Sequence, residues 1–227
     1  MISLPASLSE VWSAVATAEG NTGWLFPNEI DSQGLGTIWD PPHHFAVRQE
    51  FGEWFNALDF LIESSDANTS LLHYTHSGVI FENFEINNEA AQQHTDFYLH
   101  TLKEYLTHFK SRSATYIGGG PGGLQGSEAS QSPNGFVLLK AALGLPSTIV
   151  RDQSYHITPE GIEAFEGVID YNEVNFLGIR TSDALYRFFG RNAFGAPAGM
   201  SIHSFAENAN QSSLTEIWQS WLTNAVS

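Results

Sequence analysis

Cysteine is absent from the chain, and basic residues are scarce. Without a thiol the protein has no disulfide, no thiolate metal site and no cysteine nucleophile. Nine Lys and Arg stand against 25 Asp and Glu, a formal net charge of −16, and the basic residues are scattered along the chain. Phosphate backbones and anionic membrane surfaces attract clustered Lys and Arg. We therefore expect no nucleic-acid partner, and we interpret the acidity as favouring solubility.

Long apolar runs are also lacking. No stretch approaches the roughly 20 apolar residues that a membrane helix needs. Residues 1–5 lack the basic start and apolar run of a signal peptide. We therefore expect a cytoplasmic protein with no membrane association.

Aromatic residues, by contrast, are plentiful. The chain is 42% hydrophobic and 13% aromatic, with six Trp and sixteen Phe. This composition predicts a globular protein whose core is built largely from flat, bulky side chains. Its 227 residues suffice for one large domain or for two of about 110 residues each.

The first half is predicted to form a helix, then several strands, then a second helix. Ser7 to Glu10 form a capping box, which predicts a helix start. Loop residues follow at 28–36, and alternating apolar residues predict antiparallel strands at 45–51, 57–63 and 70–76. A long apolar stripe then predicts a helix over 89–110.

The second half repeats this order. Residues 111–133 are rich in Gly and Ser and predict a linker, either a flexible connection or a surface loop; no Gly-Lys-Ser/Thr follows the glycines, which excludes a phosphate loop. Ser132-Pro133 predicts a helix start, and a capping box from Ser213 to Glu216 predicts the start of the last helix. Strands are predicted between these helices, at 153–158, 166–171, 176–180, 184–189 and 199–205.

This repetition suggests two domains, 1–112 and 113–227, the second a reduced copy of the first. A single domain with a C-terminal extension is the alternative. In the second half, Arg180, Asp183 and Arg187 lie among apolar residues, and we expect a structural ion pair there rather than an anion-binding site.

Three segments of the first half resemble a known family. Residues 8–15, 69–78 and 94–106 are similar to the first helix, the last long strand and the gripping helix of START-like (SRPBCC) proteins related to activators of the heat-shock-protein-90 ATPase. Residues 176–188 resemble the C-terminal half of uncharacterised two-part members. The resemblance implies an α+β helix-grip fold, a curved antiparallel sheet wrapped around a long C-terminal helix.

That fold implies a cavity between the sheet and the helix, because members hold apolar small molecules there. Pockets of this kind are mostly apolar with a few placed polar groups. The residues predicted to line it, with His76 as the polar anchor, are Trp24, Phe26, Trp39, Phe60, Tyr74, His76, Tyr98 and Leu102. The function expected first is thus binding of an apolar or aromatic small molecule.

Two other functions stay open. A cyclase or hydrolase would use His76 with a nearby carboxylate as general acid or base. The alternative for His76 is a purely structural role as a buried neutral imidazole. An interaction role like that of the chaperone-ATPase activators would need an exposed patch for a protein partner or a second copy of the chain.

A metal centre is not expected. The chain has nine His, but their local spacing never places three ligands together. Nothing in the sequence points to a nucleotide, flavin, haem or other cofactor.

Overall fold

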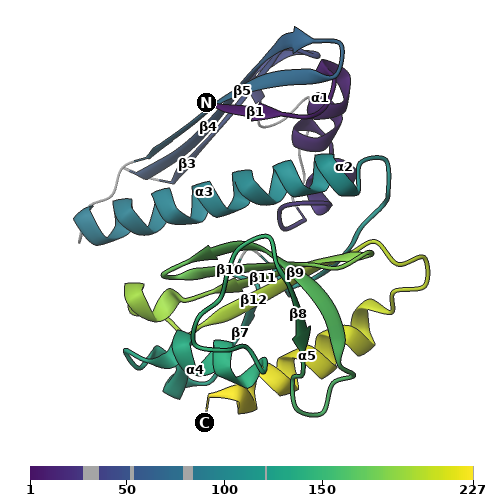
Figure 1. The fold of residues 1–227 in the computed structure, drawn as a ribbon. Coiled ribbons are helices and arrows are strands. Elements are labelled where there is room, and N and C mark those ends of the chain that lie inside the picture. Colours follow the sequence, from purple (N-terminus) through teal and green to yellow (C-terminus); the bar gives the residue numbers. More distant parts are fainter. Residues whose placement is uncertain (28–35, 52–53, 79–83, 121, 227) are drawn as a thin grey trace. The chain divides into compact units, whose positions relative to one another are not determined.

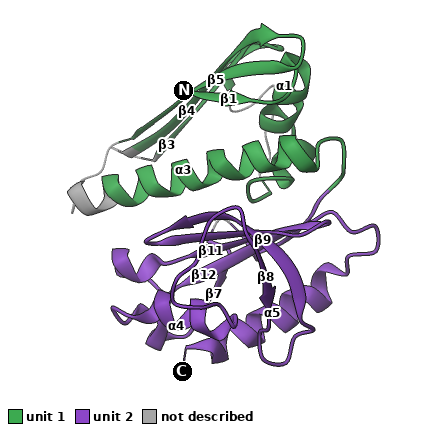
Figure 2. Ribbon diagram, viewed as in Figure 1, with its two compact units in different colours: residues 1–113 green, residues 114–227 purple. Residues whose placement is uncertain are grey.

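The computed structural model describes residues 1–27, 36–51, 54–78, 84–120 and 122–226. Contacts divide the chain into two compact units, Met1–Ser113 and Ala114–Ser227 (Figure 2). Each unit is an antiparallel sheet with a helix following its last strand (Figure 1). The predicted α+β class is therefore confirmed. The predicted loop at 28–36 lies, apart from Gly36, outside the described residues.

The first unit is a five-stranded sheet with the order β1-β5-β4-β3-β2 and helices on one face (Figure 1). Its elements are β1 (Ile2–Leu4), α1 (Leu8–Ala16), α2 (Ala18–Thr22), β2 (Gly36–Asp40), β3 (His44–Phe51), β4 (Trp54–Asp66), β5 (Thr69–Gly78) and α3 (Phe84–His108).

The predicted capping box begins α1. The Ser7 hydroxyl accepts a hydrogen bond from the backbone N–H of Glu10, and the Glu10 carboxylate accepts one from the N–H of Ser7 at 2.8 Å. The hydrogen bonds that the Glu10 carboxylate accepts from the Ser7 N–H and from the Ser7 hydroxyl lower its pKa, as does its 3.1 Å ion pair with Lys110 beyond the end of α3. Glu10 thus both caps the start of α1 and links α1 to the chain just beyond the end of the long helix.

The second unit is a larger sheet with the order β6-β12-β11-β10-β9-β8, and the short β7 also pairs with β12. Its elements are β6 (Thr115–Ile117), β7 (Leu124–Gln125), the 3₁₀ helix η1 (Glu128–Gln131), α4 (Gly135–Ala142), β8 (Ser154–Ile157), β9 (Phe165–Glu173), β10 (Phe176–Arg180), β11 (Ala184–Phe189), the 3₁₀ helix η2 (Arg191–Phe194), β12 (Gly199–Ser204) and α5 (Gln211–Ala225). All five strands predicted from 153 onward are present.

The two sheets share one topology. In each unit the first strand pairs antiparallel with the last: β1 with β5, and β6 with β12. Meandering strands lie between them, and the last strand leads into the closing helix, α3 or α5. Both sheets are open, with edge strands, rather than closed barrels. The predicted two-copy layout is thus present, but the second copy is not reduced, because within the described residues its sheet has seven strands where the first has five.

Three local predictions need correction. The glycine-rich segment is not a flexible connection between the two units, because it forms a loop within the second unit between β6 and β7, which both pair with β12. Helix α4 begins after Asn134, because the 3₁₀ helix η1 occupies the chain up to Gln131. Helix α5 begins earlier than its predicted box, because the Asn210 side chain accepts from the N–H of Ser213.

Aromatic side chains fill the core of the second unit. Trp218 and Trp221 on α5 pack edge-to-face at 5.4 Å, and Trp221 contacts Phe188 of β11 at 6.3 Å. Leu139 of α4 and Leu177 of β10 are fully buried in the same cluster. Across the described residues, no helix is both long and apolar enough to span a membrane.

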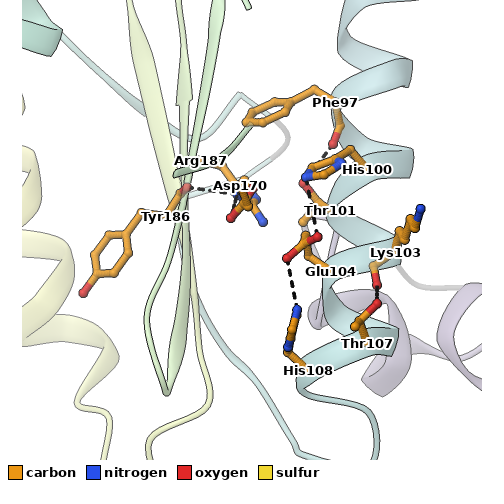
Figure 3. Close-up of polar contacts among 10 residues, drawn as sticks. All are labelled: Phe97, His100, Thr101, Lys103, Glu104, Thr107, His108, Asp170, Tyr186 and Arg187. Atoms are coloured by element: carbon orange, nitrogen blue, oxygen red, sulfur yellow. Dashed lines mark hydrogen bonds and ion pairs between the residues drawn. The ribbon is translucent and has the colours of Figure 1, made fainter. Parts of the chain in front are cut away.

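A buried ion pair lies on the opposite face of this sheet. Arg187 Nη1 of β11 contacts the two carboxylate oxygens of Asp170 of β9 at 2.7 and 2.9 Å, and Figure 3 shows the Tyr186 ring pointing the other way. Between them on β10, a Cβ at Gly178 would lie 2.3 Å from both partners, so this glycine makes room for the pair. An ion pair was expected among Arg180, Asp183 and Arg187, but the acid that pairs with Arg187 is Asp170. The sequence did not show this, because the two residues lie on β9 and β11 and meet across a glycine of the intervening strand β10.

Candidate functional site

An apolar cavity lies between the sheet and α3 of the first unit. Its volume is about 50 Å³. The residues that line it are Trp24, Leu25, Leu58, Phe60, Tyr74, Thr95, Tyr98 and Leu99. It is the part of this unit that corresponds to the predicted binding site.

The back wall is an indole held by its own hydrogen bond. Trp24 follows α2, is 3% exposed, and donates from Nε1 to the carbonyl of Ala14 at 2.9 Å. Helix α2 in turn is capped by Thr17, whose hydroxyl accepts from the N–H of Gly20. Because the polar end of the indole is satisfied, only its apolar body faces the cavity.

The sheet contributes a run of rings from three neighbouring strands. Phe45 of β3 stacks on Phe60 of β4 with centroids 4.4 Å apart, and Phe60 meets Tyr74 of β5 edge-on at 4.9 Å. Phe60 and Tyr74 are directly paired in the β4–β5 register, so strand pairing alone brings them together. Of these three rings, Phe60 and Tyr74 line the cavity, and Phe45 supports them from behind Phe60.

The polar atoms of the cavity are few and neutral. Burial raises the pKa of Tyr74 to about 12, although its hydrogen bond to the Thr95 side chain on α3 opposes the shift. The phenol therefore stays protonated at neutral pH. Tyr98 and Leu99, one turn further along α3, complete the helix side and are only half-buried. The site can hold an apolar group and offers one or two neutral hydroxyls to orient it.

Four of the eight predicted residues meet at this cavity: Trp24, Phe60, Tyr74 and Tyr98. Trp39 lies on β2 outside the lining, at the far end of the same run of rings, with its ring 5.2 Å from Trp12 and 6.2 Å from Phe45.

The other predicted lining residues do not border the cavity. Leu102 is fully buried in the core. Phe26 is half-buried after α2.

His76 lies at the exposed end of β5. The sequence predicted an inward, buried imidazole, but the strand continues past the packed part of the sheet and its residues 75–78 are all exposed. Its Nε2 lies 2.6 Å from the amide oxygen of Asn56, and partial desolvation lowers the pKa of the ring. The cyclase or hydrolase hypothesis placed a carboxylate beside His76; within the described residues its hydrogen-bond partner is this amide instead.

Histidine–carboxylate pairs occur elsewhere on this unit. Figure 3 shows Glu104 of α3 between His100 and His108, whose Nε2 atoms lie 3.8 and 3.5 Å from its oxygens. His44 pairs with Asp59 across β3 and β4. In the part of the chain that the structure describes, no three His, Asp or Glu side chains are grouped as a metal site would require.

Four lining residues were missed: Leu25, Leu58, Thr95 and Leu99. Two of them carried a usable signal. Leu58 alternates with Phe60 along the strand, and Leu99 adjoins Tyr98 on the apolar stripe of the helix. Leu25 and Thr95 carried none, because their positions depend on how α2 ends and how α3 crosses the sheet.

No protein-family model matches the chain, and no curated protein matches it either. Among solved structures, DynU16, a protein of the dynemicin biosynthetic locus, is 12% identical with a TM-score of 0.39, covering 99% of this chain and 93% of that one. CalU16 from Micromonospora echinospora is 15% identical with a TM-score of 0.35, covering 46% of this chain and 70% of that one. The Aha1 dimer from Colwellia psychrerythraea is 16% identical with a TM-score of 0.34, covering 46% and 91%.

Such low identities and TM-scores say nothing about a ligand or an activity. The layout of the chain itself decides the fold: in both units the first strand pairs with the last, and a helix follows the last strand. The fold is an α+β fold of the helix-grip type. The resemblance seen in the sequence therefore holds for the helix-grip architecture, and function has to be argued from the cavities.

Proposed function

We propose that the protein binds a small apolar or aromatic molecule between the sheet and α3 of its first unit. The observation that carries this proposal is the cavity walled by the rings of Trp24, Phe60, Tyr74 and Tyr98. An apolar lining with very few polar groups is the usual composition of a small-molecule pocket.

The size of the cavity sets a condition on the ligand. At about 50 Å³ it is smaller than the roughly 150 Å³ that holds a benzene ring. Binding therefore requires a wall to move. The half-buried Leu25, Tyr98 and Leu99 are the side chains with room to do so, and an off-rotamer shift costs about 1 kcal/mol per side chain. We expect a ligand of one or two rings, bound by opening the α3 side.

Thermal denaturation with toluene as the probe tests the proposal, using a pair of matched variants. Leu58→Phe places a ring into the cavity, whereas Leu61→Phe makes the same change three residues along β4, where Leu61 is 36% exposed and outside the lining. A ligand at ten times its Kd stabilises the folded state by about 1.4 kcal/mol, which for a unit of this size is a rise in Tm of roughly 5 °C.

Wild type and Leu61→Phe should show this rise, and Leu58→Phe should not. Equal responses from all three proteins would place toluene elsewhere and defeat the proposal, as would no response from any of them. Native mass spectrometry of the freshly purified protein, compared with its denatured mass, then searches for a natural ligand. The same spectrum shows whether the protein is a homodimer.

A further inference from the structure

The second unit contains a separate and larger cavity. It has a volume of about 470 Å³ and lies between β11, β12, the loop after β12 and the beginning of α5. This volume falls within the range of roughly 300–1,000 Å³ that is usual for ligand pockets. Its lining residues are Asp183, Ala184, Tyr186, Ile202, Ser204, Ala206, Glu207, Asn208, Ala209, Asn210, Ser213, Leu214 and Trp218.

The floor of this cavity is aromatic and fixed in place. The rings of Tyr186 and Trp218 lie 5.4 Å apart, and Phe165 stacks on Tyr186 at 4.9 Å with an interplanar angle of 19°. Trp218 is 3% exposed, so its ring is held by the core of the unit. Electron-rich ring faces of this kind attract organic cations.

One polar group on the floor is available to a ligand. Within the described residues the Tyr186 hydroxyl makes no hydrogen bond, although the ring is largely buried. Burial and the nearby Asp183 carboxylate raise the pKa of Tyr186 to about 12. The phenol therefore remains neutral at physiological pH and can accept a hydrogen bond from an ammonium group.

The charge of the rim also favours a cation. Asp183 and Glu207 line the cavity, and no Lys or Arg does. Neither carboxylate forms an ion pair within the part of the chain that the structure describes. The amino end of α5, capped by Asn210, opposes them with about half a positive charge. Two carboxylates outweigh that dipole, so the rim is negative.

From the cavity, its aromatic floor and its acidic rim together, we propose that the second unit binds a small organic cation: an amine carried on an apolar or aromatic group. The apolar part packs on Trp218 and Ile202, and the ammonium lies between the Tyr186 hydroxyl and the two carboxylates. This site is independent of the one proposed in the first unit.

Three probes with similar bodies and different charges test this proposal on the full chain. They are phenethylamine, which is a cation at neutral pH, phenethyl alcohol and 3-phenylpropionate. Fluorine NMR of protein labelled with fluorotryptophan locates the binding, because the chain has only six Trp and Trp218 is assigned by its loss in Trp218→Phe. We expect phenethylamine to move the Trp218 resonance at the lowest concentration, the alcohol to need more, and the carboxylate to have no effect.

Charge variants then test the rim. Asp183→Asn and Glu207→Gln should each weaken phenethylamine binding by about two- to fivefold, as exposed ion pairs do, and added salt should weaken it as well. Tyr186→Phe should weaken it further through loss of the hydroxyl. Glu163→Gln, an exposed acid of the same unit outside the cavity, is the matched control and should bind as wild type does.

Equal binding of the amine and the alcohol would overturn the proposal, as would tighter binding of the carboxylate or the absence of any change at Trp218. So would unchanged amine binding in the Asp183→Asn/Glu207→Gln double variant. If the second unit does not bind the amine, the Trp24 resonance of the first unit should still respond to toluene. The two proposals can therefore be refuted separately.

Discussion

Replacing Arg187 by Met should destabilise the second unit severely. Both members of the Arg187–Asp170 pair are only 2% exposed at their side chains, and the Nη1 contacts are 2.7 and 2.9 Å. Met retains much of the length and volume of the arginine stem but removes the positive charge that Nη1 places 2.7 and 2.9 Å from the buried carboxylate oxygens of Asp170. Breaking a buried pair from one side costs about 3–5 kcal/mol, a large share of the 5–15 kcal/mol that holds a typical domain folded.

The double variant Arg187→Met/Asp170→Leu provides the sharper comparison. With both charges removed no ion remains to be desolvated, so the stability should return to within about 1–2 kcal/mol of wild type. Urea unfolding followed by tryptophan fluorescence measures this, because Trp218 and Trp221 lie in the core of the same unit. The slope of the free energy of unfolding against urea concentration should be the same in all variants, which checks that the same cooperative unit unfolds in each.

A loss below about 1 kcal/mol in Arg187→Met would show that the pair is not desolvated, contrary to the reasoning. A double variant no more stable than the single one would show that packing of the arginine stem, and not its charge, is what matters. Gly178→Ala gives an independent check: its methyl group would collide with both partners, so it should be destabilising although it adds only one carbon.

Two further predictions concern the capping box and the buried phenols. Ser7→Ala removes the side-chain acceptor for the N–H of Glu10 and should lower the free energy of unfolding by about 1 kcal/mol, measured by urea unfolding; an unchanged midpoint would contradict the capping role. Tyr74 and Tyr186 keep their protons up to about pH 12, whereas an unfolded tyrosine loses its proton near pH 10. The folded state therefore binds more protons in that interval, and stability should fall as the pH rises from 10 to 12. Burial also raises the pKa of Tyr105, so an ultraviolet titration should show three of the seven Tyr ionising later than the rest, and simultaneous ionisation of all seven would be inconsistent with their burial.

Regular features of the fold could be predicted from the sequence because their signals are local. Alternation gave β3, β4 and β5, and the capping box at Ser7 gave the start of α1. The short edge strands β1 and β2 were missed, since three or five residues carry too little pattern to stand out. The glycine-rich segment was misassigned because turn residues look alike in a linker and between two paired strands.

The candidate sites depend on pairing between distant residues, which a single sequence does not show. Phe60 and Tyr74 could be placed together because a short turn joins their strands. Asp170 and Arg187 could not be placed together from the sequence. Their contact depends on the register of two strand pairings, β9 with β10 and β10 with β11, and on the glycine between them. The cavity of the second unit was not predicted at all: its walls come from residues 183–218, and neither Asp183 nor Trp218 has a local motif that marks it as part of a pocket.

The binding site in the first unit is tested most directly at Trp24. In fluorotryptophan-labelled protein, toluene should shift the Trp24 resonance, identified by its loss in Trp24→Phe, because this indole forms the back wall of the cavity. The resonance of Trp221, in the core of the second unit, should stay in place. Leu58→Phe should abolish the Trp24 shift and Leu61→Phe should preserve it. A Trp24 resonance that does not move at saturating toluene, or that still moves in Leu58→Phe, would mean that this cavity is ordinary core and that the protein does not bind its ligand there.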